Sequence, residues 1–106
     1  MRYAVIEVTA TGDSTIIPAL AGKVIRVLDY VITSNNNTNL IWKSSGGTAV
    51  SGTLYMGIHG SVIGVAGYQL PSGMFGLFET LPGEGLVLNN SAGSVGGHLT
   101  YNYIAV

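Results

Sequence analysis

Two histidines and two neighbouring glutamates are the residues of this chain best suited to acid–base chemistry or metal binding. Histidine is the side chain whose charge changes near neutral pH, and a pair of carboxylates is what a glycosidase uses. Glu79 and Glu84 flank the short turn Thr80-Leu81-Pro82-Gly83, and we expect both at its solvated rim. We expect His59 to be a hydrogen-bonding loop residue. His98 opens the last strand, where it could meet its copies around a symmetry axis, but we expect it to bond a backbone carbonyl.

No longer motif adds a reaction to this set. The chain contains no GxSxG and no HExxH pattern, and Gly22-Lys23-Val24 departs from a phosphate-binding loop because Val24 offers no hydroxyl. There is no cysteine, which excludes thiolate nucleophiles and zinc sites built on sulfur. The sequence therefore predicts no enzyme activity, no catalytic residue, no cofactor and no bound metal.

Aromatic side chains offer a different chemistry, because a flat apolar ring on a neutral polar surface can stack on a sugar. The candidates are Trp42, Tyr55, Tyr68, Phe75 and Phe78. We expect most of them to lie in the core.

Charged residues are scarce. Four basic and five acidic residues among 106 give a net charge of −1. Neither a nucleic-acid surface nor an anionic lipid surface can be bound by neutralising several phosphates with so few cations. We therefore expect no nucleic-acid partner.

One apolar stretch, from Leu54 to Leu70, contains Gly60-Ser61-Val62-Ile63-Gly64, a spacing that packs membrane helices. It is rich in glycine and shorter than the roughly 20 apolar residues that a span needs, so we predict no membrane segment. The start of the chain, Met1 to Glu7, does not resemble a secretory signal, and we expect the protein to be used where it is made.

The elements that must position these residues are strands. Segments rich in Val, Ile, Tyr, Leu and Thr alternate with Gly, Asn and Ser clusters, and 16 glycines are too many for helical interiors. The expected strands are Tyr3 to Val8, Lys23 to Thr33, Asn39 to Lys43, Thr53 to Met56, Gly85 to Leu88 and Leu99 to Val106, with turns that include Pro71-Ser72-Gly73. The chain is predicted to be all-β: a single domain over residues 1–106, an antiparallel β-sandwich and jelly roll of about eight strands.

Two of these strands are apolar on both faces. Strict alternation from Lys23 to Thr33 places Val24, Leu28, Tyr30 and Ile32 on one face and Ile25, Val27 and Val31 on the other. One small core cannot bury both faces, which favours a homo-oligomer; the alternative is a tight barrel whose central strands keep one wet face. The expected oligomer interface comprises Ile25, Val27, Val31, His98, Tyr101 and Tyr103.

About half of the chain, from Thr53 to Tyr101, resembles a pattern in small bacteriophage proteins, chiefly through two sequence elements. Phe78-Glu79-Thr80 with Pro82-Gly83-Glu84-Gly85-Leu86 and Leu88-Asn89 forms the first, and Val95-Gly96-Gly97-His98-Leu99-Thr100-Tyr101 forms the second. They are similar to elements of virion accessory proteins of the capsid-decoration or cement type. The resemblance implies a jelly-roll protomer and a homotrimer on the capsid surface of the virion, made in the host cytoplasm and bound to the major capsid protein, without a cofactor.

Two other functions are also compatible with the sequence. The first alternative is a carbohydrate-binding or host-recognition module of a phage tail or fibre, which would need exposed aromatic side chains. A small hydrolase is the more distant one.

Overall fold

The computed structural model describes residues 1–65 and 76–106, which form antiparallel strands joined by turns. The strands are β1 Arg2–Val8, β2 Gly12–Ile17, β3 Lys23–Ser34, β4 Thr38–Ser44, β5 Leu54–Met56, β6 Ser61–Val65, β7 Phe78–Glu79, β8 Leu86–Asn90 and β9 Val95–Ala105. The predicted all-β class is confirmed. The predicted turn at Pro71-Ser72-Gly73 lies outside the described residues.

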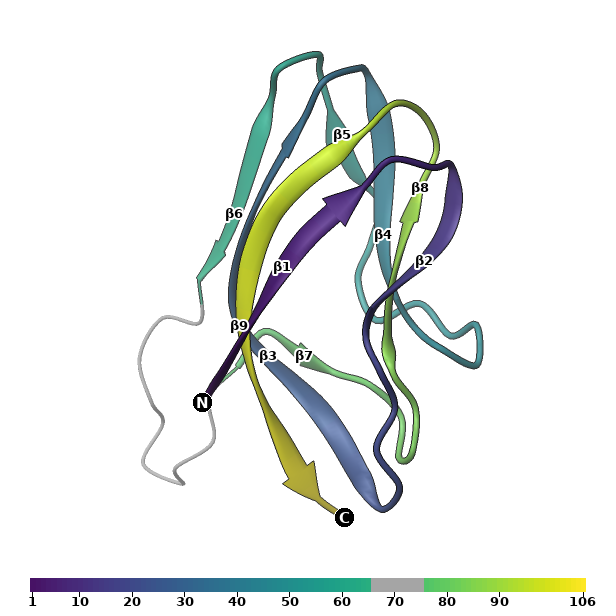
Figure 1. The fold of residues 1–106 in the computed structure, drawn as a ribbon, viewed down its shortest axis with the longest axis vertical. Helices are drawn as coiled ribbons and strands as arrows, with labels where there is room; N and C mark the ends of the chain where they lie inside the picture. Colours follow the sequence, from purple (N-terminus) through teal and green to yellow (C-terminus); the bar gives the residue numbers. More distant parts are fainter. Residues whose placement is uncertain (66–75) are drawn as a thin grey trace.

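Two packed sheets make a sandwich (Figure 1). One sheet has the order β1-β9-β3-β6, with β7 also pairing with β3, and the other has the order β2-β8-β4-β5. Successive strands lie in different sheets except β4 and β5, which share the four-stranded sheet, and β6 and β7, which share the five-stranded sheet. This is the strand order of a jelly roll, as predicted, with the two-residue β7 added to eight main strands.

The core lies between the sheets and is built around Trp42 of β4. The Trp42 ring lies 5.5 Å from the ring of Tyr30 and 6.0 Å from that of Phe78. Fully buried side chains from both sheets surround it, among them Ile6, Ile17, Ile32, Leu40, Leu86, Leu88 and Leu99. Of the candidate sugar-stacking rings, Trp42 is therefore a core residue and Phe78 is partly buried against the core.

A β-bulge in β3 overturns part of the expected oligomer interface. The pairing with β9 slips between Val27 and Asp29, so Leu28 is an extra residue. The strand therefore turns Ile25 and Val27 to the interior before the bulge, and Tyr30 and Ile32 to the interior after it. Ile25 and Val27 are each 0% exposed. The prediction that they lie on an outer interface is wrong, because it assumed unbroken alternation along the strand.

Tyr101 of β9 is also buried in the core, so it too is unavailable to another copy. Tyr103, two residues further along, is half-buried: its hydroxyl donates to the Pro18 carbonyl oxygen at 2.9 Å, and its ring lies 5.5 Å from that of Tyr101. Burial, together with the neighbouring Tyr101, raises the pKa of the Tyr103 hydroxyl. Of the six expected interface residues, Val31 and His98 lie on the outer side of their sheet.

The apolar stretch that begins at Leu54 forms β5 and β6 as far as Val65. In residues 1–65 and 76–106, no helix has the length and apolar character that crossing a membrane requires.

Candidate functional site

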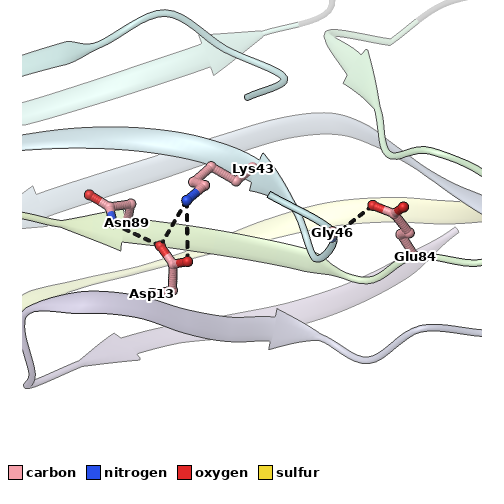
Figure 2. Close-up of polar contacts among 5 residues, drawn as sticks. All are labelled: Asp13, Lys43, Gly46, Glu84 and Asn89. Carbon is pink, nitrogen blue, oxygen red and sulfur yellow. Dashed lines mark hydrogen bonds and ion pairs between the residues drawn. The ribbon is translucent and has the colours of Figure 1, made fainter. Parts of the chain in front are cut away.

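The two candidate catalytic glutamates hold different parts of the fold together. Glu79 lies on β7 and accepts a hydrogen bond from Arg26 Nε at 2.6 Å. Glu84 lies beyond the turn, where its Oε1 accepts from Ser44 Oγ at 2.6 Å. The same oxygen accepts from the Gly46 N–H at 2.8 Å (Figure 2). Both hydrogen bonds lower the pKa of the Glu84 carboxyl, and the bond from Ser44 has the larger effect. Each carboxylate thus bonds its own separate partners, and these contacts hold the fold together.

Thr80, which the sequence did not single out, is the buried centre of this turn. Its hydroxyl accepts from the Ile25 N–H at 2.9 Å and donates to the Glu84 carbonyl oxygen at 3.1 Å. Gly83 has a φ of 74°, in the left-handed region that glycine adopts at no steric cost, and its N–H donates to the Lys23 carbonyl oxygen at 2.8 Å. The segment Phe78 to Asn89 thus contains a turn that fastens β7 and β8 to β3.

A third carboxylate, Asp13, lies on the outer face of the four-stranded sheet (Figure 2). It accepts from Asn89 Nδ2 at 2.7 Å and from Lys43 Nζ at 3.2 and 3.3 Å. These bonds, that from Asn89 first, lower the pKa of the Asp13 carboxyl. The three residues come from the adjacent strands β2, β8 and β4, so only the strand order could have revealed the cluster.

His59 lies in a loop, as expected, and is exposed. The hydrogen bond expected of its side chain is not among those made by residues 1–65 and 76–106. The φ of His59 is 57°, in a turn closed by a 2.9 Å hydrogen bond from the Gly60 N–H to the Gly57 carbonyl oxygen. His59 shares an open hollow of about 370 Å³ with Glu7. Across residues 1–65 and 76–106, no group of three or more His, Asp or Glu side chains is placed to hold a metal ion. One imidazole and one carboxylate fall short of the three protein ligands typical of a catalytic zinc site.

His98 lies at the centre of the outer face of the five-stranded sheet. Its strand neighbours place it in a row that runs from Val5 on β1, through His98 on β9 and Val31 on β3, to Ile63 on β6. The Tyr3 ring lies 5.9 Å from its imidazole. The expected bond from His98 to a backbone carbonyl is not among the hydrogen bonds that the described part of the chain makes.

The next row along this face runs from Tyr3 through Thr100 and Asp29 to Val65. Thr100 Oγ1 donates to Asp29 Oδ1 at 2.7 Å, which satisfies part of that carboxylate. The apolar members at both ends of the two rows are open to solvent: Tyr3 is 65% exposed, Val5 59%, Ile63 66% and Val65 66%.

We call the surface made by these two rows the outer apolar face: Tyr3, Val5, Asp29, Val31, Ile63, Val65, His98 and Thr100. It contains Val31 and His98 of the expected interface. The sequence prediction of the interface missed the four exposed apolar residues Tyr3, Val5, Ile63 and Val65. The alternation of β1 could have indicated the first two, whereas β6 was hidden in the stretch that resembled a membrane segment.

Tyr55 is the exposed aromatic on the opposite sheet, 82% open to solvent. It pairs across the strands with Asn39 and borders an open hollow of about 430 Å³ that also includes Asn37 and Ser91. Of the other candidate sugar-stacking rings, Tyr68 and Phe75 lie outside the described residues.

No protein-family model, no curated protein and no solved structure matches this chain. The described residues offer two candidate binding surfaces: the outer apolar face of one sheet and, on the other sheet, a neutral hollow beside the exposed Tyr55.

Proposed function

We propose that this chain is a structural protein of a bacteriophage particle, a homotrimer that binds the major capsid protein and stabilises the shell. The observation that carries the proposal is the outer apolar face, four of whose large side chains are more than half exposed. An isolated domain gains nothing by leaving these apolar side chains in water, whereas burying them drives association. The role proposed is assembly, without a reaction or a cofactor.

The arrangement of charge supports a partner bound through apolar and backbone contacts. Arg26 pairs with Glu79, and Lys43 pairs with Asp13, so two of the four cations already have anionic partners within the fold. Little charge remains for steering a partner over long distances. A complex of this kind should change little with ionic strength, because screening acts on exposed charges.

The second phage-like element also agrees with this proposal. Val95 to Tyr101 belongs to β9, which lies between β1 and β3 in the five-stranded sheet. It supplies His98 and Thr100 to the outer apolar face, while Leu99 and Tyr101 point into the core. The element thus contributes to both the fold and the proposed assembly surface.

The test is to strip phage particles of this protein and heat them with and without the purified chain, at low and high salt. Binding to the intact shell alone should raise the opening temperature, because at a hundredfold excess over Kd each site adds about 2.7 kcal/mol. We expect most of that gain to persist in high salt. Particles that open at the same temperature with and without the protein would contradict the proposal.

Recognition of a host carbohydrate is the second candidate function, and the neutral hollow beside Tyr55 is the observation that favours it. The exposed Tyr55 ring offers one stacking surface, and the neighbouring side chains of Asn39 and Ser91 offer neutral hydrogen-bonding groups. Binding of host polysaccharide should then be lost in Tyr55→Ala and kept in Tyr3→Ala, an exposed tyrosine on the other sheet. Equal binding by both variants, or none by the wild type, excludes this candidate.

A further inference from the structure

We infer that the outer apolar face is occupied by another copy of this chain, and that the β1 half of one copy, Tyr3 and Val5, packs on the β6 half of the next, Ile63 and Val65. This rests on the proposed assembly function and names the partner of its surface.

The pattern of the face is self-complementary. The two outer strands of the sheet, β1 and β6, carry its largest exposed apolar side chains, while the inner strands, β9 and β3, carry His98, Thr100, Asp29 and Val31. A half-turn about an axis parallel to the strands, between two such faces, brings the β1 half of one copy over the β6 half of the other. A cyclic arrangement of three copies can use the same β1-to-β6 contact once at each junction.

The size of the face suits an interface between copies. Its four exposed apolar side chains form two pairs, Tyr3 and Val5 on β1 and Ile63 and Val65 on β6, and each side chain is more than half exposed. A second copy that covers both pairs buries the most exposed apolar side chains of this sheet, and the neighbouring parts of the sheet must supply the rest of the roughly 800 Å² per partner of a standard interface. Two such sheet faces pack about 10 Å apart, as in any β-sandwich.

The charged groups on or beside the face are Asp29, Glu7 and the ion pair of Arg26 with Glu79, whose atoms lie 2.6 Å apart. The Thr100 hydroxyl donates to Asp29 at 2.7 Å but is neutral and does not compensate its charge. Like charges placed together would cost several kcal/mol, so the packing must keep Asp29 away from its counterpart. Placing β1 of one copy over β6 of the next does this, because Asp29 on β3 then faces β9 of the other copy. His98 and Thr100 keep polar atoms at the centre, where a second copy can pair with them.

The absence of cysteine from the sequence allows a direct test. Val5 and Ile63 are separated by three strand spacings, about 14 Å, too far for a disulfide within one chain, which needs Cα atoms within about 7 Å. The double variant Val5→Cys/Ile63→Cys should form disulfides between copies under mild oxidation, at least tenfold faster than Val5→Cys or Ile63→Cys alone. A band that stops at the dimer indicates two-fold packing, and a ladder to the trimer indicates a ring of three; both support the contact.

Two outcomes overturn the inference. One is equal cross-linking of the single and double variants. The other is a double variant that stays uncross-linked while the wild type is a monomer by light scattering. Val5→Thr and Ile63→Thr provide a second measurement, since these exposed side chains can be made polar at nearly constant shape; each should weaken self-association at least tenfold, and unchanged association also overturns the contact. Because particle binding is measured separately, a monomer that still stabilises particles refutes this inference and leaves the proposed function intact.

Discussion

Ser44, Thr80 and Glu84 show how single residues of this chain satisfy polar groups that no strand pairing reaches. The Ser44 hydroxyl donates to Glu84 and accepts from the Leu81 N–H at 3.1 Å, while Thr80 bridges Ile25 and Glu84. A carboxylate that accepts two hydrogen bonds is held in its charged form. The same residue types that suggested acid–base chemistry are used here to fix a turn.

The lowered pKa of Glu84 predicts a pH-dependent contribution to stability. The folded carboxyl has a pKa below the ordinary value of 4.5, so its contribution is present above that value and is lost as the pH falls through the folded pKa. Glu84→Gln should therefore melt below the wild type at neutral pH, by a small but measurable margin that closes at pH values below 4.5. The measurement is the melting temperature as a function of pH. Glu7→Gln, at an exposed carboxyl, controls for the loss of one negative charge.

Gly97 predicts a second effect at the scale of one residue. Its φ is 149°, and a Cβ atom there would overlap the Val31 carbonyl oxygen of the neighbouring strand. Gly97→Ala should therefore destabilise the fold by about 3 kcal/mol or more, through strain and overpacking. At the adjacent Gly96 the nearest atom to such a Cβ is the Ile6 carbonyl oxygen at 3.7 Å, an ordinary contact. Gly96→Ala should stay within about 0.5 kcal/mol of the wild type in chemical denaturation; similar losses in both variants would contradict this explanation.

Among the secondary-structure elements, β3 connects the most parts of the sheet, because it pairs with β9, β6 and β7. Its strand character follows from Val, Ile and Tyr content and was predictable. Its bulge was not, since the extra residue is defined only by pairing with β9, a strand more than sixty positions away. The same limit explains the interface error at Ile25 and Val27. β2 was missed because its turn-like start, Gly12 and Asp13, obscured a short strand.

The turn after β7 provides the prediction at this scale. Thr80→Val keeps the shape of the side chain but removes the hydroxyl, which leaves the buried Ile25 N–H without its acceptor. An unsatisfied buried donor costs about 1–3 kcal/mol, so Thr80→Val should be destabilised by that amount. Thr80→Ser retains the hydroxyl and should lose less. Denaturation midpoints of the two variants give the comparison, and a Ser variant that is the weaker of the two would show that the methyl group matters more than the hydrogen bond.

Across the whole molecule, the two sheets expose different chemistry. The four-stranded sheet presents Asp13, Lys43 and Asn89 to solvent in one hydrogen-bonded cluster (Figure 2). The five-stranded sheet presents the outer apolar face, with Asp29 at its centre bonded to Thr100. The scarcity of charge was evident from composition, but its division between the sheets depends on strand order. This asymmetry is why one side of the sandwich is proposed for self-association and the other for solvent or a neutral ligand.

If copies associate through the outer apolar face, thermal stability must depend on protein concentration, because unfolding then also separates the copies. For a dimer, a tenfold increase in concentration adds about 1.4 kcal/mol, which corresponds to roughly 3 °C in Tm for two chains of this length. Melting curves recorded over a hundredfold range of concentration should therefore rise steadily for the wild type. Ile63→Thr combined with Val65→Thr should flatten that dependence, whereas Tyr55→Thr, an equally exposed change on the opposite sheet, should preserve it. A wild-type Tm that is constant over the whole range means that the face stays in water, and self-association through it would then have to be abandoned.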